Sequence, residues 1–339
     1  MNQGLEGVVA AETSLSMVDG ERGELIIAGY PVEELAPNAT FEEVVALLGV
    51  SAGGDRTIPS VAYEILGRFA DPMDTLRAAA GLLVEEQLLA AFPTIVAAHW
   101  RIRNHQQPIP PRNDLRHAAN YLYMLDGEVP SRERERALET YLNTVVDHGL
   151  NASTFTARVI TSTGSDLVSA IVGAVGALKG PLHGGAPGPA LDMVFEIGEA
   201  SRAEEVLRKK IESGERLMGF GHRVYKVRDP RADVLAAAAE RLLGNDPLYR
   251  LAKSVEAAAI RLLEEYKPGR RLQTNVEFYT ALLLHGIGLP TPLFTPTFAI
   301  SRVAGWLAHC LEQRRTGRLI RPQSVYIGPR NLHFKPTYA

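Results

Sequence analysis

The chain is most informative at residues 218–231, which read Met-Gly-Phe-Gly-His-Arg-Val-Tyr-Lys-Val-Arg-Asp-Pro-Arg. Glycines at 219 and 221 precede His222, and four cations follow it, the last of them Arg231. Glycine lets the backbone approach a ligand closely, and the cations supply fixed positive charge beside an imidazole that titrates near neutral pH. These residue types predict a site for a small, multiply charged anion whose chemistry needs a proton.

The composition predicts an ordinary globular enzyme. The chain has 339 residues, of which 46% are hydrophobic and 22% charged, so it can bury a large core in one or two domains. The net charge of −3 implies no general attraction to nucleic acid or to an anionic membrane. Cys310 is the single cysteine and is expected to be a buried, inert thiol. With neither a secretory signal nor a bilayer-spanning run, we expect a cytoplasmic protein.

The hydrophobic spacing predicts a mainly α fold with a small extended piece near the N-terminus. Residues 5–30 read as short strands, with a turn at 18–22 and a strand from residue 24. Strand–helix alternation is absent, so a doubly wound parallel sheet is unexpected. Small residues over 157–178 predict a helix that other helices approach closely, within one helix over 153–178. Helices are also expected at 41–48, 75–89, 94–103, 114–125, 131–147, 203–213, 230–243, 248–266, 276–285 and 297–314.

His183 is a second candidate for chemistry. Phosphate-loop, zinc-protease and serine-hydrolase motifs are missing from the sequence. His183 lies in Gly180-Pro-Leu-His-Gly-Gly185, at the predicted end of the long helix. A lone histidine is often a hydrogen-bonded core residue, but such a residue does not need glycines on both sides. The flanking glycines therefore favour a functional role.

A carboxylate and three arginines complete the set. Glu277 opens an otherwise apolar helix, where the simpler interpretation is a partner for the helix dipole. Arg302 lies within an apolar helical stripe, which is unfavourable for a charge without a partner, and Arg321 precedes a proline. With Arg231, such guanidinium groups suit a dicarboxylate. Together with two histidines that polarise carbonyl oxygens, the set predicts carbon–carbon bond formation between an enolised substrate and a keto acid.

The sequence resembles the citrate synthase family, in particular its bacterial and archaeal type II members and the 2-methylcitrate synthases. The resemblance extends from residue 4 to residue 329 and is carried by separated motifs in family order. These motifs are Asp147-His-Gly-Leu-Asn-Ala-Ser, Gly180-Pro-Leu-His-Gly-Gly-Ala, Gly219-Phe-Gly-His-Arg-Val-Tyr-Lys, Asp229-Pro-Arg, Asn275-Val-Glu-Phe-Tyr and Arg321-Pro.

The resemblance implies catalytic roles for three residues. His183 would stabilise the enol of the acyl-CoA thioester, and Glu277 would take the methyl proton. His222 would hydrogen-bond the oxaloacetate carbonyl and protonate it as the new bond forms. Oxaloacetate itself would be held by His148, Arg231 and Arg302, with Arg321 from the partner subunit.

The resemblance also implies an assembly and a division into domains. It indicates an almost all-helical homodimer, with a large domain at 1–183 and 284–339 and a small mobile domain at 184–283. Acetyl-CoA would be a co-substrate, with no permanently bound cofactor, no metal, and neither nucleic acid nor membrane as a partner. Arg223 and Lys226 would either meet the CoA phosphates or stay solvated, and the sequence does not separate these alternatives.

Departures from the family pattern leave three interpretations open. Glu277 stands where the family has aspartate, Pro187 stands where it has asparagine, and Ala281 replaces the usual glycine. The region after Leu48 is also shorter and richer in glycine than in the family. The chain could be a citrate synthase that uses acetyl-CoA, or a 2-methylcitrate synthase that uses propionyl-CoA. It could also be a weakly active or inactive relative that acts by regulation or assembly.

Overall fold

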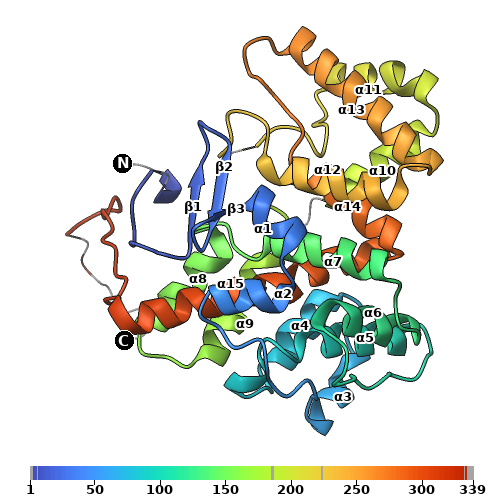
Figure 1. Cartoon of the computed structure of the whole chain (residues 1–339). Coiled ribbons are helices and arrows are strands. Elements are labelled where there is room, and N and C mark those ends of the chain that lie inside the picture. Colours follow the sequence, from blue (N-terminus) through green and yellow to red (C-terminus); the bar gives the residue numbers. More distant parts are fainter. Residues whose placement is uncertain (1–2, 6, 185–186, 223, 332, 334–339) are drawn as a thin grey trace.

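The fold is built almost entirely of helices, as the sequence predicts. The computed structural model describes residues 3–5, 7–184, 187–222, 224–331 and 333, and Figure 1 shows their arrangement. Within these residues lie fifteen α-helices and one three-stranded sheet.

The N-terminal sheet is small and antiparallel. Its strands are β1 (Ser16–Asp19), β2 (Glu24–Ile27) and β3 (Tyr30–Pro31), in the order β1-β2-β3. Leu25 and Ile27 alternate with more exposed neighbours and are buried, as expected for a strand with one face on the core. The predicted turn at 18–22 joins β1 to β2, so this part of the prediction is confirmed.

The helices fall into two sets along the chain. The first set is α1 (Val32–Asn38), α2 (Phe41–Leu47), α3 (Ser60–Leu66), α4 (Pro72–Ala80), α5 (Phe92–Arg103), α6 (His117–Asp126), α7 (Arg132–Val145), α8 (Ala152–Ser162) and α9 (Leu167–Leu178). The second set is α10 (Pro187–Ile197), α11 (Ala203–Glu212), α12 (Pro230–Leu243), α13 (Pro247–Tyr266), α14 (Val276–Ile287) and α15 (Phe294–Thr316). Short 3₁₀ turns lie at Gln3–Leu5, Glu85–Gln87, Ala200–Arg202 and Thr291–Leu293.

Two predicted helices are shorter than the apolar spacing indicates. The single helix expected over 153–178 is wrong, because Gly164 adopts a φ of 84° and Asp166 caps a new helix by accepting from the Ser169 amide. The helix expected over 75–89 ends at Ala80, and a 3₁₀ turn follows. Periodicity alone does not reveal such breaks, because both flanking segments bury apolar faces in the same core.

Two groups of helices meet along α7 and α12. Helices α10 to α14 pack chiefly on one another in the upper part of Figure 1, while α4 to α9 and α15 lie below them. Between the groups, α7 contacts both α12 and α14, and α1 contacts α12. Trp306 at the centre of α15 is fully buried, and so is Cys310, whose thiol has its pKa raised to about 11 by burial. The candidate residues therefore come from both sides of one junction.

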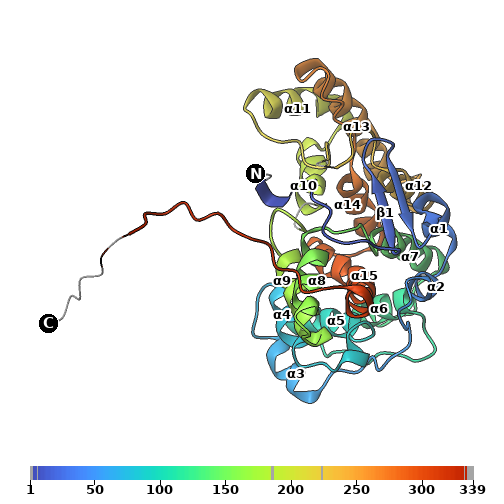
Figure 2. The ribbon, with the colours of Figure 1, turned by 90° about the vertical axis from the view of Figure 1, so that its left-hand side faces the viewer.

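The chain leaves the helical body after α15. Residues 317–331 contain no helix or strand, and Figure 2 shows this segment running away from the rest of the molecule. Most of its side chains are exposed, including the large apolar side chains of Val325 and Ile327.

Candidate active site

Backbone hydrogen bonds hold the segment that carries His222 beside the segment that leads into α14 and Glu277. Gly221 donates its amide to the Gln273 carbonyl at 2.7 Å, and Asn275 donates to the Gly219 carbonyl at 3.0 Å. The Asn275 side chain also donates to the Gly221 carbonyl at 2.8 Å and accepts from the amide of Glu277. This pairing places the residue after Gly221 beside the start of α14, although some fifty residues separate them in the sequence.

Gly219 is required by the closeness of this pairing. It has a φ of 88°, and a β-carbon added to it would lie 2.9 Å from the Phe278 β-carbon. A side chain at this position would both strain the backbone and push the segment away from α14. Gly219 therefore allows two backbone segments to pack closely. Its position in the sequence did not distinguish this role from close approach of the backbone to a ligand.

Arg231 is fixed at the start of α12 by Asp229. The Arg231 guanidinium donates to both oxygens of the buried Asp229 carboxylate, at 3.0 and 2.9 Å. Asp229 also accepts from the amide of Arg231 as the N-cap and from the Val276 amide at the start of α14. One carboxylate thus sets the position of the guanidinium relative to the helix that carries Glu277.

His222 has its tautomer set by the backbone that follows it. Its Nδ1 accepts from the amides of Val224 and Tyr225 at 3.0 and 3.1 Å. A neutral imidazole that accepts at Nδ1 carries its proton on Nε2. That Nε2 lies 3.2 Å from Nη2 of Arg231, which is also a donor. Two donors therefore face one another, an arrangement that an oxygen atom of a ligand satisfies.

His148 and Arg302 approach from the lower helices. His148 follows α7, and its Nε2 lies 3.0 Å from the Tyr225 hydroxyl. The His148 ring also lies edge-on to the ring of His222, with centroids 6.1 Å apart. The nearby charges of Arg231 and Arg302 add to burial in holding the pKa of His148 well below its usual value. These contacts place the histidine after α7 beside both arginines and His222.

Arg302 is a buried cation with no carboxylate in ion-pair contact among the described residues. Its Nε donates to the Val145 carbonyl at 2.7 Å, and its side chain is shielded from solvent within α15. Burial lowers its pKa to about 10, although the charge of Asp147 opposes this effect. Gly305 lets α15 come this close, since a β-carbon there would lie 2.3 Å from the Val146 carbonyl oxygen. Such a guanidinium has donors left for a ligand.

His183 lies in the turn after α9, where Ser153 of α8 binds it. The Ser153 hydroxyl is 2.8 Å from Nε2 of His183, accepts from the Trp306 indole at 3.0 Å and donates to Oδ1 of Asn151 at 2.8 Å. Burial, followed by the charge of Arg302, lowers the pKa of His183 to about 4. The imidazole is therefore neutral near pH 7, and its protonation pattern depends on the one hydroxyl proton of Ser153.

Glu277 is the candidate base and lies in the first turn of α14. It is mostly buried, and burial raises the pKa of its carboxyl above the usual value, although the charge of Arg231 opposes the shift. The helix entry is anchored through Asn275 and Val276, so the backbone of Glu277 has a fixed position. A carboxylate with a raised pKa in a confined site is suited to accept a proton.

The structure does not bring every predicted residue to this site. Arg321 lies in the C-terminal segment after α15, where it is exposed and lines a different cavity with Phe155 and Arg158 of α8. Arg223 lies outside the described residues. Lys226 is exposed, and its amide donates to the Gly20 carbonyl at 2.8 Å.

Two arginines that sequence reasoning missed lie beside His222. A cavity of about 490 Å³ is lined by His222 and Lys226 from one loop and by Arg270 and Arg271 from another. Arg270 and Arg271 precede the Asn275 motif by only a few residues. The pair of adjacent cations next to that motif was the signal that could have identified them.

The buried histidines predict a strong loss of stability in acid. The pKa of His222 is lowered to about 4, first by burial and then by Arg231, and that of His183 lies at a similar value. In the unfolded chain both return to about 6.5. Between these values the unfolded state binds protons that the folded state does not, so stability falls as the pH falls from 6.5 towards 4.

Urea unfolding at a series of pH values tests this expectation. Each histidine is expected to contribute about 3 kcal/mol to the decrease between pH 7 and pH 4. In His183→Asn, the decrease in the free energy of unfolding between pH 7 and pH 4 is expected to be smaller by about 3 kcal/mol. The pH dependence above pH 7 is expected to stay unchanged. An identical acid slope in the variant would contradict the assignment.

Within the described residues, no group of three or more histidine, cysteine, aspartate or glutamate side chains is arranged to hold a metal ion. Over the same part of the chain, no helix combines the length and apolar character needed to cross a membrane.

The comparisons with known proteins cover nearly the whole chain. The family model described as citrate synthase, C-terminal domain, matches residues 4–323. The chain belongs to the citrate synthase family. A relative named citrate synthase 2, from Bacillus subtilis, is 39% identical, with 98% of each chain covered. Another, named 2-methylcitrate synthase, from Shewanella oneidensis, is 38% identical, covering 96% of this chain and 94% of the relative.

A solved structure supports the same conclusion about the fold. The citrate synthase of Thermoplasma acidophilum, in a ternary complex with carboxymethyl coenzyme A and oxaloacetate, matches with a TM-score of 0.89 and 30% identity, covering 99% of this chain and 98% of that one. Members of the citrate synthase family transfer an acyl group to oxaloacetate, so the predicted enzyme class and the helical family fold are confirmed.

Proposed function

We propose that this member of the family condenses acetyl-CoA with oxaloacetate and hydrolyses the resulting thioester to citrate and CoA. The observation that carries the proposal is the pair of donors from His222 and Arg231, 3.2 Å apart, with the buried cation of Arg302 among the charges around His148. Oxaloacetate is a dianion with a carbonyl oxygen between its carboxylates. Buried guanidinium groups suit its carboxylates, and a neutral imidazole N–H suits its carbonyl.

The first chemical step is removal of a methyl proton from acetyl-CoA. The Glu277 carboxylate accepts this proton, and the electron pair of the C–H bond moves towards the thioester oxygen. His183 donates a hydrogen bond to that oxygen from Nδ1 once the Ser153 hydroxyl proton turns from Oδ1 of Asn151 to Nε2 of His183, 2.8 Å away. With a pKa of about 4, the imidazole of His183 is neutral at pH 7, so it stabilises the enolate as a hydrogen-bond donor.

The second step forms the carbon–carbon bond. The nucleophilic carbon of the enolate attacks the carbonyl carbon of oxaloacetate, and the carbonyl oxygen takes the Nε2 proton of His222 to become a hydroxyl group. Arg231, beside that nitrogen, compensates the charge that develops. Water then attacks the thioester carbonyl and returns a proton to Nε2 of His222. The C–S bond breaks, and the thiolate of CoA takes the proton held by Glu277 and leaves as the thiol, which gives citrate. The roles of His183, His222 and Glu277 remain part of this proposal.

We further propose that residues 184–283 form a mobile domain and that 1–183 and 284–339 form a larger one. Support comes from the packing of α10 to α14 chiefly on one another and from the position of the site residues on both sides of the junction with α7. Closure of the two would exclude water and strengthen the electrostatic contacts. The boundary at residue 283 lies within α14, so this helix would move with the hinge.

The cavity beside His222 is the proposed site for the phosphate groups of the acyl-CoA. Lys226, Arg270 and Arg271 supply its positive charge. Arg271→Gln is expected to raise the KM for acetyl-CoA about tenfold, because it removes a charged hydrogen bond worth about 1.5–3 kcal/mol. The KM for oxaloacetate is expected to stay unchanged. Initial rates at varied acetyl-CoA test this, with the exposed Arg250→Gln as the matched control. Equal rises for both substrates would argue against the assignment.

A homodimer in which Arg321 enters the partner's site is the proposed assembly. The exposed, extended segment that carries Arg321 supports it. Arg321→Gln and Glu277→Gln are each expected to be nearly inactive alone. In a mixed dimer, one of the two sites would contain both intact residues, so co-folding the variants should restore part of the activity. Failure to recover activity in a confirmed mixed dimer would contradict a contribution across the interface.

Release of free CoA thiol tests the overall function. The purified protein is incubated with oxaloacetate and either acetyl-CoA or propionyl-CoA, and turnover is compared. Faster release with acetyl-CoA is expected. Preference for propionyl-CoA would favour the 2-methylcitrate synthase alternative, which the Shewanella relative keeps open, since one methylene changes binding by only about 1–3 kcal/mol. No release with either would leave the regulatory alternative. A cytoplasmic location remains a prediction.

A further inference from the structure

A second charged cavity lies away from the reaction site, between α7 and α12. It has a volume of about 520 Å³, within the range of small-molecule sites. Arg241 near the end of α12 lines it, ten residues after Arg231, so the two lie about 15 Å apart along the helix. The cavity is therefore separate from the residues assigned to oxaloacetate and to CoA.

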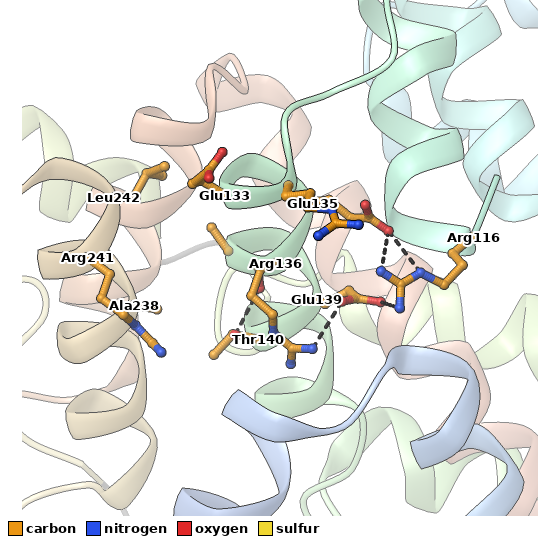
Figure 3. A pocket seen from close by; sticks show the side chains of 11 residues that line it. Arg116, Glu133, Glu135, Arg136, Glu139, Thr140, Ala238, Arg241 and Leu242 are labelled. Atoms are coloured by element: carbon orange, nitrogen blue, oxygen red, sulfur yellow. Dashed lines mark hydrogen bonds and ion pairs between the residues drawn. The ribbon is translucent and has the colours of Figure 1, made fainter.

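The cavity wall on the α7 side is a fixed network of charges. Arg136 donates to the Glu139 carboxylate at 3.1 Å and to the carbonyls of Ala36 and Ala39 at 2.9 and 2.7 Å. Arg116 pairs with Glu135 at 2.7 Å. Figure 3 shows Glu139 between Arg116 and Arg136. These contacts hold Arg136 in one place, so it is preorganised to interact with a further group.

The network has unused polar atoms. Glu139 is almost fully buried, with 1% of its surface exposed, and its Oε1 accepts no hydrogen bond among the described residues, although it forms an ion pair with Nη1 of Arg116 at 3.5 Å. Nε of Arg136 is buried and lacks an acceptor among those residues. Such a buried donor is unfavourable unless a ligand or water occupies the space beside it.

Positive charge exceeds negative charge in the cavity. Four arginines and three glutamates line it, and neither Arg132 nor Arg241 forms an ion pair within the described part of the chain. Figure 3 shows Arg241 extending from α12 into the space beside α7. Burial, partly opposed by Glu139, lowers the pKa of Arg136, and the charges of Arg116 and Arg241 add to the shift. An anion would relieve this repulsion between like charges.

We propose that this cavity binds a small phosphate-bearing anion, held between Arg241 of α12 and Arg136 of α7. The planar guanidinium fork matches phosphate oxygens, and arginines on opposite walls suit an anion with oxygens in several directions. Ala238 and Leu242 form an apolar part of the wall, which excludes water and strengthens the charge contacts. Anion binding at this site is independent of the proposed reaction. The two sites nevertheless share helices, because α12 carries Arg231 and α7 precedes His148.

Calorimetric titration with inorganic pyrophosphate tests the proposal. The titration uses full-length Arg271→Gln, in which the other basic cavity is weakened. Pyrophosphate is expected to bind this protein, and the added change Arg241→Gln is expected to weaken binding about tenfold or more, as the loss of a charged hydrogen bond implies. The added change Arg250→Gln, at an exposed residue of α13, is the matched control and should leave the affinity unchanged.

Two results would overturn the proposal. One is absence of pyrophosphate binding to the Arg271→Gln protein, and the other is equal affinity with and without Arg241→Gln. Arg241 is exposed, so its substitution is expected to preserve folding. A circular dichroism spectrum and an unfolding midpoint equal to those of the Arg271→Gln protein verify this, and Arg241→Lys provides a second variant that keeps the charge but loses the fork.

Discussion

Glu277→Gln is expected to reduce turnover by about 10³-fold or more while leaving oxaloacetate affinity nearly intact. The amide has almost the same shape but cannot accept the methyl proton, and loss of a general base costs about 10²–10⁴-fold. The burial that raises the pKa of Glu277 also keeps water from replacing it as a base. Oxaloacetate contacts depend on other residues, so its binding should persist.

Release of CoA thiol and equilibrium binding of oxaloacetate measure the two effects separately. Glu264→Gln, an exposed change on α13, is the matched control and should be fully active. Normal turnover of Glu277→Gln would show that another group is the base. A parallel loss of oxaloacetate binding would show that the substitution disturbs the site as a whole.

Glu277→Asp extends the same prediction. The backbone at the start of α14 is held by Asn275 and by the bond from Val276 to Asp229. This anchoring prevents the helix from advancing to compensate for a shorter side chain. A misplacement of about 1 Å can cost about 10²-fold in rate, so we expect a loss of that order in kcat. Full activity of Glu277→Asp would instead show that the carboxylate can reach the substrate with either side-chain length.

Arg302→Met is expected to raise the KM for oxaloacetate by about 10²-fold or more. A guanidinium contributes charged hydrogen bonds of about 1.5–3 kcal/mol each, and a clamp on a carboxylate uses two of them. Loss of both accounts for the expected change. Methionine keeps much of the volume of the side chain, so packing within α15 should be retained.

The same substitution should not reduce the stability of the ligand-free protein. The pKa of Arg302 is lowered to about 10, which corresponds to about 3 kcal/mol of unfavourable burial of its charge at neutral pH. Loss of the bond to the Val145 carbonyl offsets part of that gain. Thermal unfolding without substrate therefore should show an unchanged or higher midpoint. A large decrease in midpoint, with an unchanged KM, would identify Arg302 as a structural residue instead.

Local sequence patterns predicted much of the secondary structure. The turn and strand at residues 18–27 and the helix over 230–243 follow from turn residues, capping and apolar spacing. The break at Gly164 was missed because apolar spacing continues across it. A glycine and an aspartate followed by small residues are compatible with one helix or with two, and the packing of α8 against α9 favours two.

The candidate site was predicted as a set of residue types and could not be predicted as a geometry. Arg270 and Arg271 were missed because two adjacent cations in a loop resemble a solvated surface. Ser153 and Tyr225 were missed because a hydroxyl group gives no sign in the sequence of the histidine that it will contact. Which segments lie side by side depends on hydrogen bonds between residues far apart in the sequence, such as those that join Gly219 and Gly221 to Asn275 and Gln273.

The sequence by itself determined the residue types of the site, because an imidazole, a carboxylate and guanidinium groups have chemistry that does not depend on the fold. It did not determine that Gly219 serves close packing against α14, because a glycine at that position is equally compatible with approach to a ligand. Only the tertiary structure decided which charges are buried and which are solvated. Burial makes His183 and His222 neutral, raises the pKa of Glu277 and leaves Arg302 charged without an ion pair among the described residues. These effects arise because removal of water from a charged group depends on every element packed around it.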